Sequence, residues 1–305
     1  MSLLIALLVT WAVLAVVWIL ALPKSSNRVG WLYPLLPLIA GVVLWRWPDI
    51  PVLRDWMEAA VWLWAGLSLV WLVSVLKRDS SIMDIAYGYL MCALPWWMWL
   101  HNGSDMRAWL PLLLTTLGFG RYSIYITWRN LPNAEDARYA RWRQRSGANW
   151  WWWSYFQVFL LQGVVLWFWV FALVLAIVFP QDFGLWHVAG ALVWLIGFVF
   201  EVGGDWQLAQ FKRKRKSSSE LLNTGLWALT RHPNYFGQTA MWWGYGLIAM
   251  ASPYGWLGLL SLAYITWFMY TGSATSLMER HLLKTKPGYA EYCGRVPAFF
   301  PRLKP

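Results

Sequence analysis

Long runs of apolar residues dominate the chain and predict its architecture. Nine of these runs approach the roughly 20 residues that an α-helix needs to cross a bilayer. They lie at about residues 2–21, 31–47, 56–76, 82–100, 108–128, 155–179, 185–206, 235–251 and 254–275. The second and eighth runs are short. The pattern predicts an all-α, polytopic membrane bundle of about nine transmembrane helices.

The composition excludes an ordinary soluble domain. Apolar and aromatic residues make up 59% of the 305 residues, and charged residues only 13%, which is about half the usual share. The two cysteines, Cys92 and Cys293, lie far apart in the chain. They provide neither a disulfide framework nor a thiolate cluster, so no metal site is expected.

The basic residues predict the orientation of the bundle. The net charge of +11 would indicate nucleic acid in a soluble protein, but here the charges follow the loops and no nucleic-acid partner is expected. With nine spans, the 25 lysines and arginines fall on one side except for Arg46, Arg54, Arg107 and the intramembrane Arg121. Because cytoplasmic loops are rich in Lys and Arg, we expect the N-terminus outside and the C-terminus in the cytoplasm.

An acidic segment at the cytoplasmic end of the seventh run is one candidate site. Glu201 and Asp205 lie four residues apart on one helix face, and Gln207 follows them. Carboxylates inside a membrane helix are costly and usually line a polar cavity, so they indicate a site. The alternative is that they neutralise the basic run at 212–216 near the interface.

A polar turn before the eighth run is a second candidate site. It reads Arg231-His232-Pro233-Asn234-Tyr235. Proline suits the first turn of a helix, so a helix is predicted to begin here with free backbone N–H groups beside the basic pair. Such an end favours a phosphate, a pyrophosphate or a carboxylate. The alternative is a plain turn with a solvated Arg-His pair.

The polar tail after the last run is a third candidate. Residues 276–301 carry Glu279, His281 and a Pro-Gly-Tyr-x-x-Tyr sequence, and they are too polar to enter the bilayer. We expect the tail to fold back against the cytoplasmic end of the bundle. The alternative is a helix that lies on anionic lipid at the membrane surface.

Together these motifs resemble the steroid 5-alpha-reductase-like integral membrane family, and in particular its bacterial branch. The resemblance rests on Arg-His-Pro-Asn-Tyr-Phe-Gly at 231–237, Glu-x-x-x-Asp-x-Gln at 201–207, the tail, and Asn-Leu-Pro-x-x-Glu-Asp-x-Arg-Tyr at 130–139. It covers about residues 80–301. The chain is therefore divided into three N-terminal spans at 1–79 and a reductase-like domain at 80–305. A bacterial member would lie in the inner membrane with its active site facing the cytoplasm.

The resemblance implies NADPH as the cofactor and hydride transfer to a conjugated carbon–carbon double bond of a steroid-like or other lipid enone. Asp205, Asn234 and basic residues after the fifth span match cofactor-binding positions, and Arg121 matches an arginine at the cavity. With their polar neighbours, the expected cofactor-binding set is Arg121, Arg129, Glu201, Asp205, Gln207, Arg231, His232, Asn234, Tyr235, Glu279 and His281.

Two positions depart from the steroid reductases. Gly118 replaces their catalytic tyrosine, and Gln238 stands where they carry a glutamate. Tyr87 is the expected substitute as proton donor, with Asp84 one turn earlier to orient its phenol. Tyr122 and Tyr125 are alternatives for the donor. Asp84 has its own alternative, a first-turn acid that caps the helix and complements its dipole.

Two other functions stay open. Isoprenylcysteine carboxyl methyltransferases carry a similar Arg-His-Pro-x-Tyr-x-Gly turn and bind S-adenosylmethionine, whose carboxylate would suit the same helix end. Against this reading, Arg280 follows Glu279 where that family carries paired glutamates. A non-catalytic lipid-binding membrane protein is the third possibility, favoured by the missing tyrosine.

Overall fold

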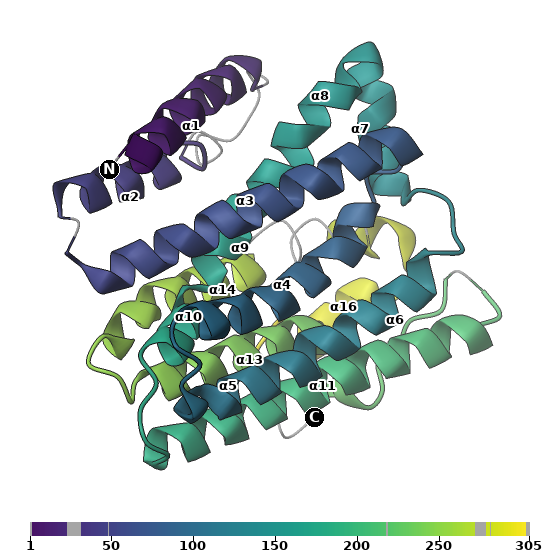
Figure 1. Cartoon of the computed structure of the whole chain (residues 1–305). Coiled ribbons are helices and arrows are strands. Elements are labelled where there is room, and N and C mark those ends of the chain that lie inside the picture. The colour runs from purple at the N-terminus through teal and green to yellow at the C-terminus, as the bar shows by residue number, and fades with distance from the viewer. Residues whose placement is uncertain are drawn as a thin grey trace. The chain divides into compact units, whose positions relative to one another are not determined.

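The computed structural model describes residues 2–22, 32–47, 49–217, 219–271, 279–280 and 282–302. These residues form helices joined by short loops, and none of them lies in a strand. Within this part of the chain, a helix occupies each of the predicted apolar ranges (Figure 1). The fold divides into two compact units, residues 1–178 and 179–305. The domain boundary at residue 79 stays a prediction. Each unit is described by itself.

The N-terminal unit contains the longer series of helices. They are α1 (Ser2–Ala21), α2 (Leu36–Arg46), α3 (Pro51–Lys77), α4 (Ile82–His101), α5 (Trp109–Thr115), α6 (Arg121–Asn130), α7 (Ala137–Ser146), α8 (Trp150–Ser154), α9 (Leu161–Trp169) and α10 (Phe171–Val178). Short 3₁₀ turns at Met106–Ala108 and Gly147–Asn149 precede α5 and α8. Helix α3 packs against α2, α4, α9 and α10, and α4 packs in addition against α5, α6 and α10.

Two π-helical segments interrupt the regular helices of the N-terminal unit. Thr116–Gly120 lies between α5 and α6, and Tyr155–Leu160 lies between α8 and α9. The fifth predicted run is therefore not one regular helix. Single-turn π segments occur often at functional sites, and the first of them contains Gly118 and ends directly before Arg121.

The C-terminal unit is built on two long helices. It contains α11 (Leu185–Lys214), α12 (Leu226–Leu229), α13 (Pro233–Ala249), α14 (Leu259–Thr271) and α16 (Tyr289–Arg295), with a 3₁₀ turn at Gly255–Gly258. Glycines allow α11 and α13 to approach closely, because a methyl group at Gly197 would lie 2.6 Å from the backbone nitrogen of Met241. Near the end of this contact, Gly204 packs against Pro233. The start of α13 therefore lies beside the polar end of α11.

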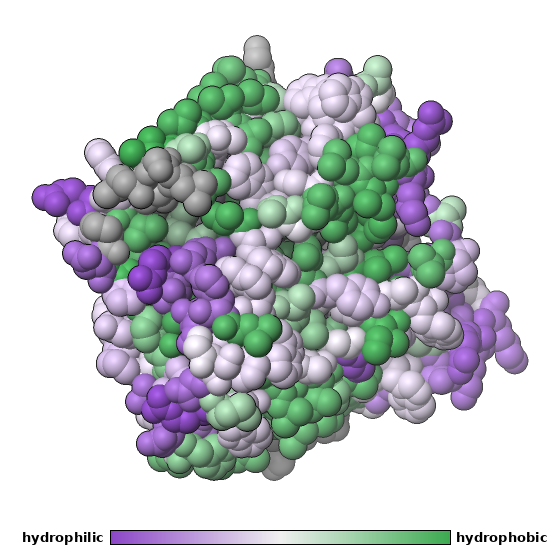
Figure 2. All heavy atoms as spheres, in the orientation of Figure 1, coloured by the Kyte–Doolittle hydropathy of each residue, from purple (hydrophilic) through white to green (hydrophobic). Residues whose placement is uncertain are grey.

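The length and surface of the helices are those of a membrane protein. Helices α3 and α11 are long and apolar enough to cross a bilayer, and residues 137–178 would form a third span with a 49° bend. Large apolar side chains are exposed, including Leu76 at 84% and Leu185 at 82%. Figure 2 shows hydrophobic side chains over much of the visible face. The nine-span topology and the orientation of the termini stay predictions.

Candidate cofactor and catalytic residues

The start of α13 is built as the sequence predicts. Pro233 occupies the first turn, and His232 is the N-cap residue. The imidazole ring of His232 is buried and stacks on Tyr235, with ring centroids 5.3 Å apart and an interplanar angle of 8°. The turn is thus a packed element, and the alternative of a solvated Arg-His pair does not describe it.

One hydrogen bond joins this turn to the acidic segment of α11, and a second joins α12 to the same segment. The Asn234 side-chain amide donates to Oδ1 of Asp205 over 3.2 Å. The backbone N–H of Leu226 donates to Oε1 of Gln207 over 3.0 Å. Two residues of the expected cofactor-binding set, Asp205 and Asn234, are therefore in direct contact, and Gln207 holds α12. Glu201, one turn before Asp205, is buried at 7% exposure.

Arg231 is held by protein groups on several sides. Its Nε and Nη2 donate to the two carboxylate oxygens of Glu279 over 2.9 and 3.2 Å. Its Nη1 donates to the backbone carbonyls of Cys293 and Val296 over 3.0 and 2.7 Å. These contacts use four of the five N–H donors of a guanidinium. Arg231 therefore clamps the turn to the tail.

Glu279 is the centre of this cluster. Besides Arg231, its Oε1 lies 3.0 Å from Nε2 of His232. The hydrogen bond with His232, followed by the bonds and charge of Arg231, lowers the pKa of Glu279 to about 2 despite the opposing effect of burial. Glu279 is therefore ionised at neutral pH and balances the charge of Arg231.

The tail folds back onto the 226–232 segment within the C-terminal unit, as its polarity predicts. The Thr230 hydroxyl donates to the carbonyl of Phe299 over 2.8 Å, and the Arg231 N–H donates to that of Pro297 over 2.9 Å. The hydroxyl of Tyr292, on α16, donates to the carbonyl of Trp227. The expected residue His281 lies outside the described residues.

In the N-terminal unit, Asp84 contacts α7. Its Oδ1 accepts a 2.7 Å hydrogen bond from the hydroxyl of Tyr139, and its Oδ2 accepts one of 2.8 Å from Nη2 of Arg138. Tyr139 is 2% exposed. Neither Tyr139 nor Arg138 was among the expected site residues, although both belong to the 130–139 motif.

An acid of the 130–139 motif, Glu135, anchors the loop before α4. Glu135 accepts hydrogen bonds from Nε and Nη2 of Arg143 over 3.0 and 2.8 Å. It also accepts a 2.7 Å hydrogen bond from the backbone N–H of Ser80, whose hydroxyl accepts one from the indole of the buried Trp150. The 130–139 motif therefore fixes α7 against the start of α4.

The other expected residues of this unit surround aromatic rings. Tyr87 contacts Tyr122, with ring centroids 5.0 Å apart. The guanidinium groups of Arg121 and Arg129 lie 6.0 and 5.6 Å from the ring centre of Tyr125. These residues belong to the N-terminal unit, whereas the expected residues between 201 and 279 belong to the C-terminal unit.

The fold defines an all-helical membrane protein with polar clusters at its helix ends. The chain belongs to the family described as "Protein of unknown function (DUF1295)", whose family model matches residues 70–296. This match covers the 130–139 and 201–207 motifs, the Arg-His-Pro turn and most of the tail.

Three relatives extend the comparison. An uncharacterised protein of Schizosaccharomyces pombe is 26% identical over 272 residues, which are 77% of this chain and 76% of that protein. The Delta(14)-sterol reductase LBR of Gallus gallus is 30% identical over 129 residues, 37% of this chain and 20% of that protein. The nickel-cobalt-cadmium resistance protein NccN of Alcaligenes xylosoxydans xylosoxydans is 35% identical over 124 residues, 39% of this chain and 53% of that protein.

The family match and the long apolar helices support a membrane protein. The names of the sterol reductase and of the metal-resistance protein describe those relatives. Among the described residues of this chain, no three His, Cys, Asp or Glu side chains are grouped so that they could hold a metal ion.

Proposed function

We propose that the protein is an NADPH-dependent membrane reductase that transfers a hydride to a conjugated carbon–carbon double bond of a steroid-like or other lipid enone. The proposal rests on one observation above all. Asn234, at the first turn of α13, is hydrogen bonded to Asp205 of α11. These are the two residues that match cofactor-binding positions in the resemblance to steroid reductases. The partial similarity to a sterol reductase supports the same chemistry.

The residues around this contact fit a dinucleotide. The first turn of a helix presents backbone N–H groups and the positive end of the helix dipole, which favour phosphate. Asn234 and Tyr235 would contact the cofactor directly. Arg231 would act as a positioning residue, because Glu279 and the tail already hold its guanidinium. When bound, NADPH supplies the hydride.

Tyr87 is the proposed proton donor for the substrate. Reduction of an enone gathers negative charge on the carbonyl oxygen, so a positioned acid must stabilise it. Tyr139 is less suited, because its buried hydroxyl already donates to Asp84. Tyr87 is half-buried and retains accessible surface. In this arrangement Asp84 acts by holding α7 and its own helix together beside Tyr87.

The proposed setting is a bacterial inner membrane, with nine spans and the cofactor-binding residues facing the cytoplasm. The distribution of basic residues supports this orientation. Reporter fusions after Lys216 and after Pro305 should both read cytoplasmic. An external reading at either position would overturn the topology.

One observation favours a second function, an S-adenosylmethionine-dependent methyltransferase. The ionised Glu279 lies within hydrogen-bond distance of both His232 and Arg231. A carboxylate at this place opposes a second anion but favours a cation such as a sulfonium or an ammonium group. The same cluster would therefore suit S-adenosylmethionine if the cofactor lies close to Glu279.

Binding calorimetry on the purified full-length protein tests the choice between the two cofactors. We expect NADPH to bind and S-adenosylmethionine not to bind. Asn234→Ala should weaken NADPH binding by about 1 kcal/mol, the usual worth of a hydrogen bond. Asn223→Ala is the matched control, because Asn223 is exposed on the same segment. Binding of S-adenosylmethionine in place of NADPH would make the protein a methyltransferase.

A further inference from the structure

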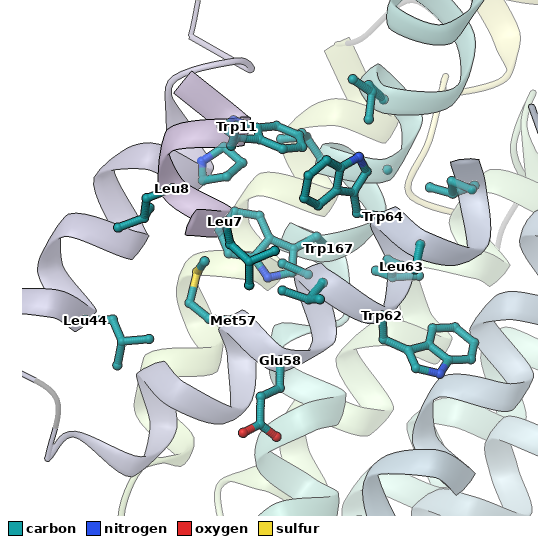
Figure 3. Close-up of a pocket in the computed structure, with 18 of the residues that line it drawn as sticks. Leu7, Leu8, Trp11, Leu44, Met57, Glu58, Trp62, Leu63, Trp64 and Trp167 are labelled. Atoms are coloured by element: carbon teal, nitrogen blue, oxygen red, sulfur yellow. The ribbon is translucent and has the colours of Figure 1, made fainter. Parts of the chain in front are cut away.

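A large apolar cavity lies within the N-terminal unit, and neither Tyr87 nor Asp84 lines it. Its volume is about 650 Å³, which is within the range of small-molecule sites. Helices α1, α2, α3 and α9 supply its walls, and Figure 3 shows Leu7 and Leu8, Leu44, Met57 and Trp167 around it. Most of the lining residues precede residue 70, where the family match begins.

Three of the five tryptophans that line the cavity, Trp11, Trp64 and Trp167, donate their indole N–H to protein groups. Trp11 donates to the carbonyl of Pro34 over 2.9 Å, and Trp64 donates to the hydroxyl of Tyr155 over 2.8 Å. Trp167 donates to the carbonyl of Trp56, with which it also stacks. These three indoles therefore require no hydrogen bond from a ligand, and the apolar side chains of the lining suit a hydrocarbon chain.

One end of the cavity is charged. Arg54 and Glu58 line it and lie one turn apart on the same face of α3. Glu58 faces His101 at 3.6 Å, and Arg54 lies 3.6 Å from the buried Asp55. Figure 3 shows Glu58 at the opposite end of the cavity from Trp11 and Trp64. A neighbouring cation and anion match a headgroup that carries both charges.

The length of the cavity matches one leaflet of a bilayer. Its lining residues on α3 extend from Arg54 to Leu67. At 1.5 Å per residue this is about 20 Å, compared with about 15 Å for half of the hydrocarbon core. An acyl chain of a membrane lipid would therefore reach from the charged end to the apolar end.

We propose that this cavity binds one acyl chain of a zwitterionic phospholipid, with its phosphate at Arg54 and its ammonium group at Glu58. Phosphoethanolamine is the headgroup that we expect. The site goes beyond the proposed reductase function, because it uses neither the Asp205–Asn234 contact nor Tyr87. A failure of the cofactor experiments would leave it standing.

Native mass spectrometry of the full-length protein in detergent tests the proposal. Phosphatidylethanolamine and phosphatidylglycerol with identical acyl chains are titrated separately. We expect one phosphatidylethanolamine per protein, bound at least about tenfold more tightly than phosphatidylglycerol. Ala60→Phe fills the cavity and should abolish this binding. Leu69→Phe is the matched control, because Leu69 is 65% exposed on the same helix and does not line the cavity.

The headgroup assignment has its own variants. Glu58→Gln should remove the preference for phosphatidylethanolamine, whereas Arg46→Gln, an exposed arginine outside the cavity, should keep it. Melting temperatures verify that each variant is folded, and Ala65→Phe blocks the same cavity if Ala60→Phe does not fold. Equal binding of the two lipids, or undiminished binding in a folded cavity-filling variant, would overturn the proposal.

Discussion

The hydroxyl of Tyr139 donates a 2.7 Å hydrogen bond to the carboxylate of Asp84, across 55 residues of sequence. This contact joins α7 to the first turn of α4, two residues before Ala86 and three before Tyr87. Asp84, which was expected to orient the phenol of Tyr87, therefore also holds two residues of the 130–139 motif, Arg138 and Tyr139. Removal of the Asp84 carboxylate should therefore lower the stability of the fold.

A double-mutant cycle measures this relationship. Asp84→Asn and Tyr139→Phe should each lower the free energy of unfolding, with a coupling of about 1 to 2 kcal/mol because the bond involves a charged group. The control cycle pairs Asp84→Asn with Tyr89→Phe on the same helix, where Tyr89 is exposed and contacts Thr127. Equal coupling in both cycles would contradict the assignment.

Glu279 should stabilise the fold through its contacts with Arg231 and His232. Glu279→Gln removes the partner of Arg231 and His232, so it should lower the free energy of unfolding by about 1.5 to 3 kcal/mol in a denaturing-detergent titration. Glu291→Gln is the matched control, because Glu291 forms an exposed ion pair with Arg295, which is worth about 0.3 to 0.5 kcal/mol. A small loss for both variants would show that the cluster does not hold the tail.

The same residue predicts a pH dependence. The pKa of Glu279 is about 2 in the folded protein, against an ordinary value of 4.5. Because the folded state binds the proton less readily, the carboxylate stabilises the fold fully above about pH 4.5, by at most about 3 kcal/mol. That stabilisation falls as the pH drops from 4.5 to 2.

Parallel unfolding titrations of the unmodified protein and Glu279→Gln between pH 7 and pH 2.5 isolate this effect. Other carboxyl groups titrate in both proteins, so their contributions cancel in the difference. The difference in unfolding free energy should stay constant down to about pH 4.5 and then narrow. A difference that narrows already between pH 7 and pH 5 would mean that another group, not Glu279, controls the cluster.

The hydrophobic pattern predicted the positions of the main helices well, because each of them carries a long run of apolar residues. It did not predict the π-helical segment at Thr116–Gly120. An added residue per turn depends on how neighbouring helices pack, and no local composition marks it. The length of α11 was also underestimated, because its last turns are polar and extend beyond the apolar run to Lys214.

The candidate site was predicted in part. Proline at the first turn of α13 has a local physical cause, so its position followed from the sequence. The partner of Arg231 did not, because Glu279 lies 48 residues away and only the folded tail brings it close. The role of Tyr139 was not predicted for the same reason, because its partner Asp84 lies 55 residues away in the chain.

The proton donor is tested by turnover. Tyr87→Phe should reduce the rate of NADPH oxidation with a lipid enone by roughly 10²- to 10⁴-fold and leave NADPH affinity unchanged. Tyr125→Phe is measured in comparison, because Tyr125 is an alternative donor; its ring contacts Arg121 and Arg129. Tyr139→Phe should lower stability more than rate. Full turnover in Tyr87→Phe would assign the proton to another group.

The most direct test of the reductase function follows the hydride itself. NADPH that carries deuterium at C4 of the nicotinamide is incubated with the purified protein and a panel of lipid enones, and the products are analysed by mass spectrometry and NMR. We expect a saturated product with deuterium at the former β-carbon. Absence of deuterium in every product, together with transfer of a labelled methyl group from S-adenosylmethionine to a lipid, would contradict it.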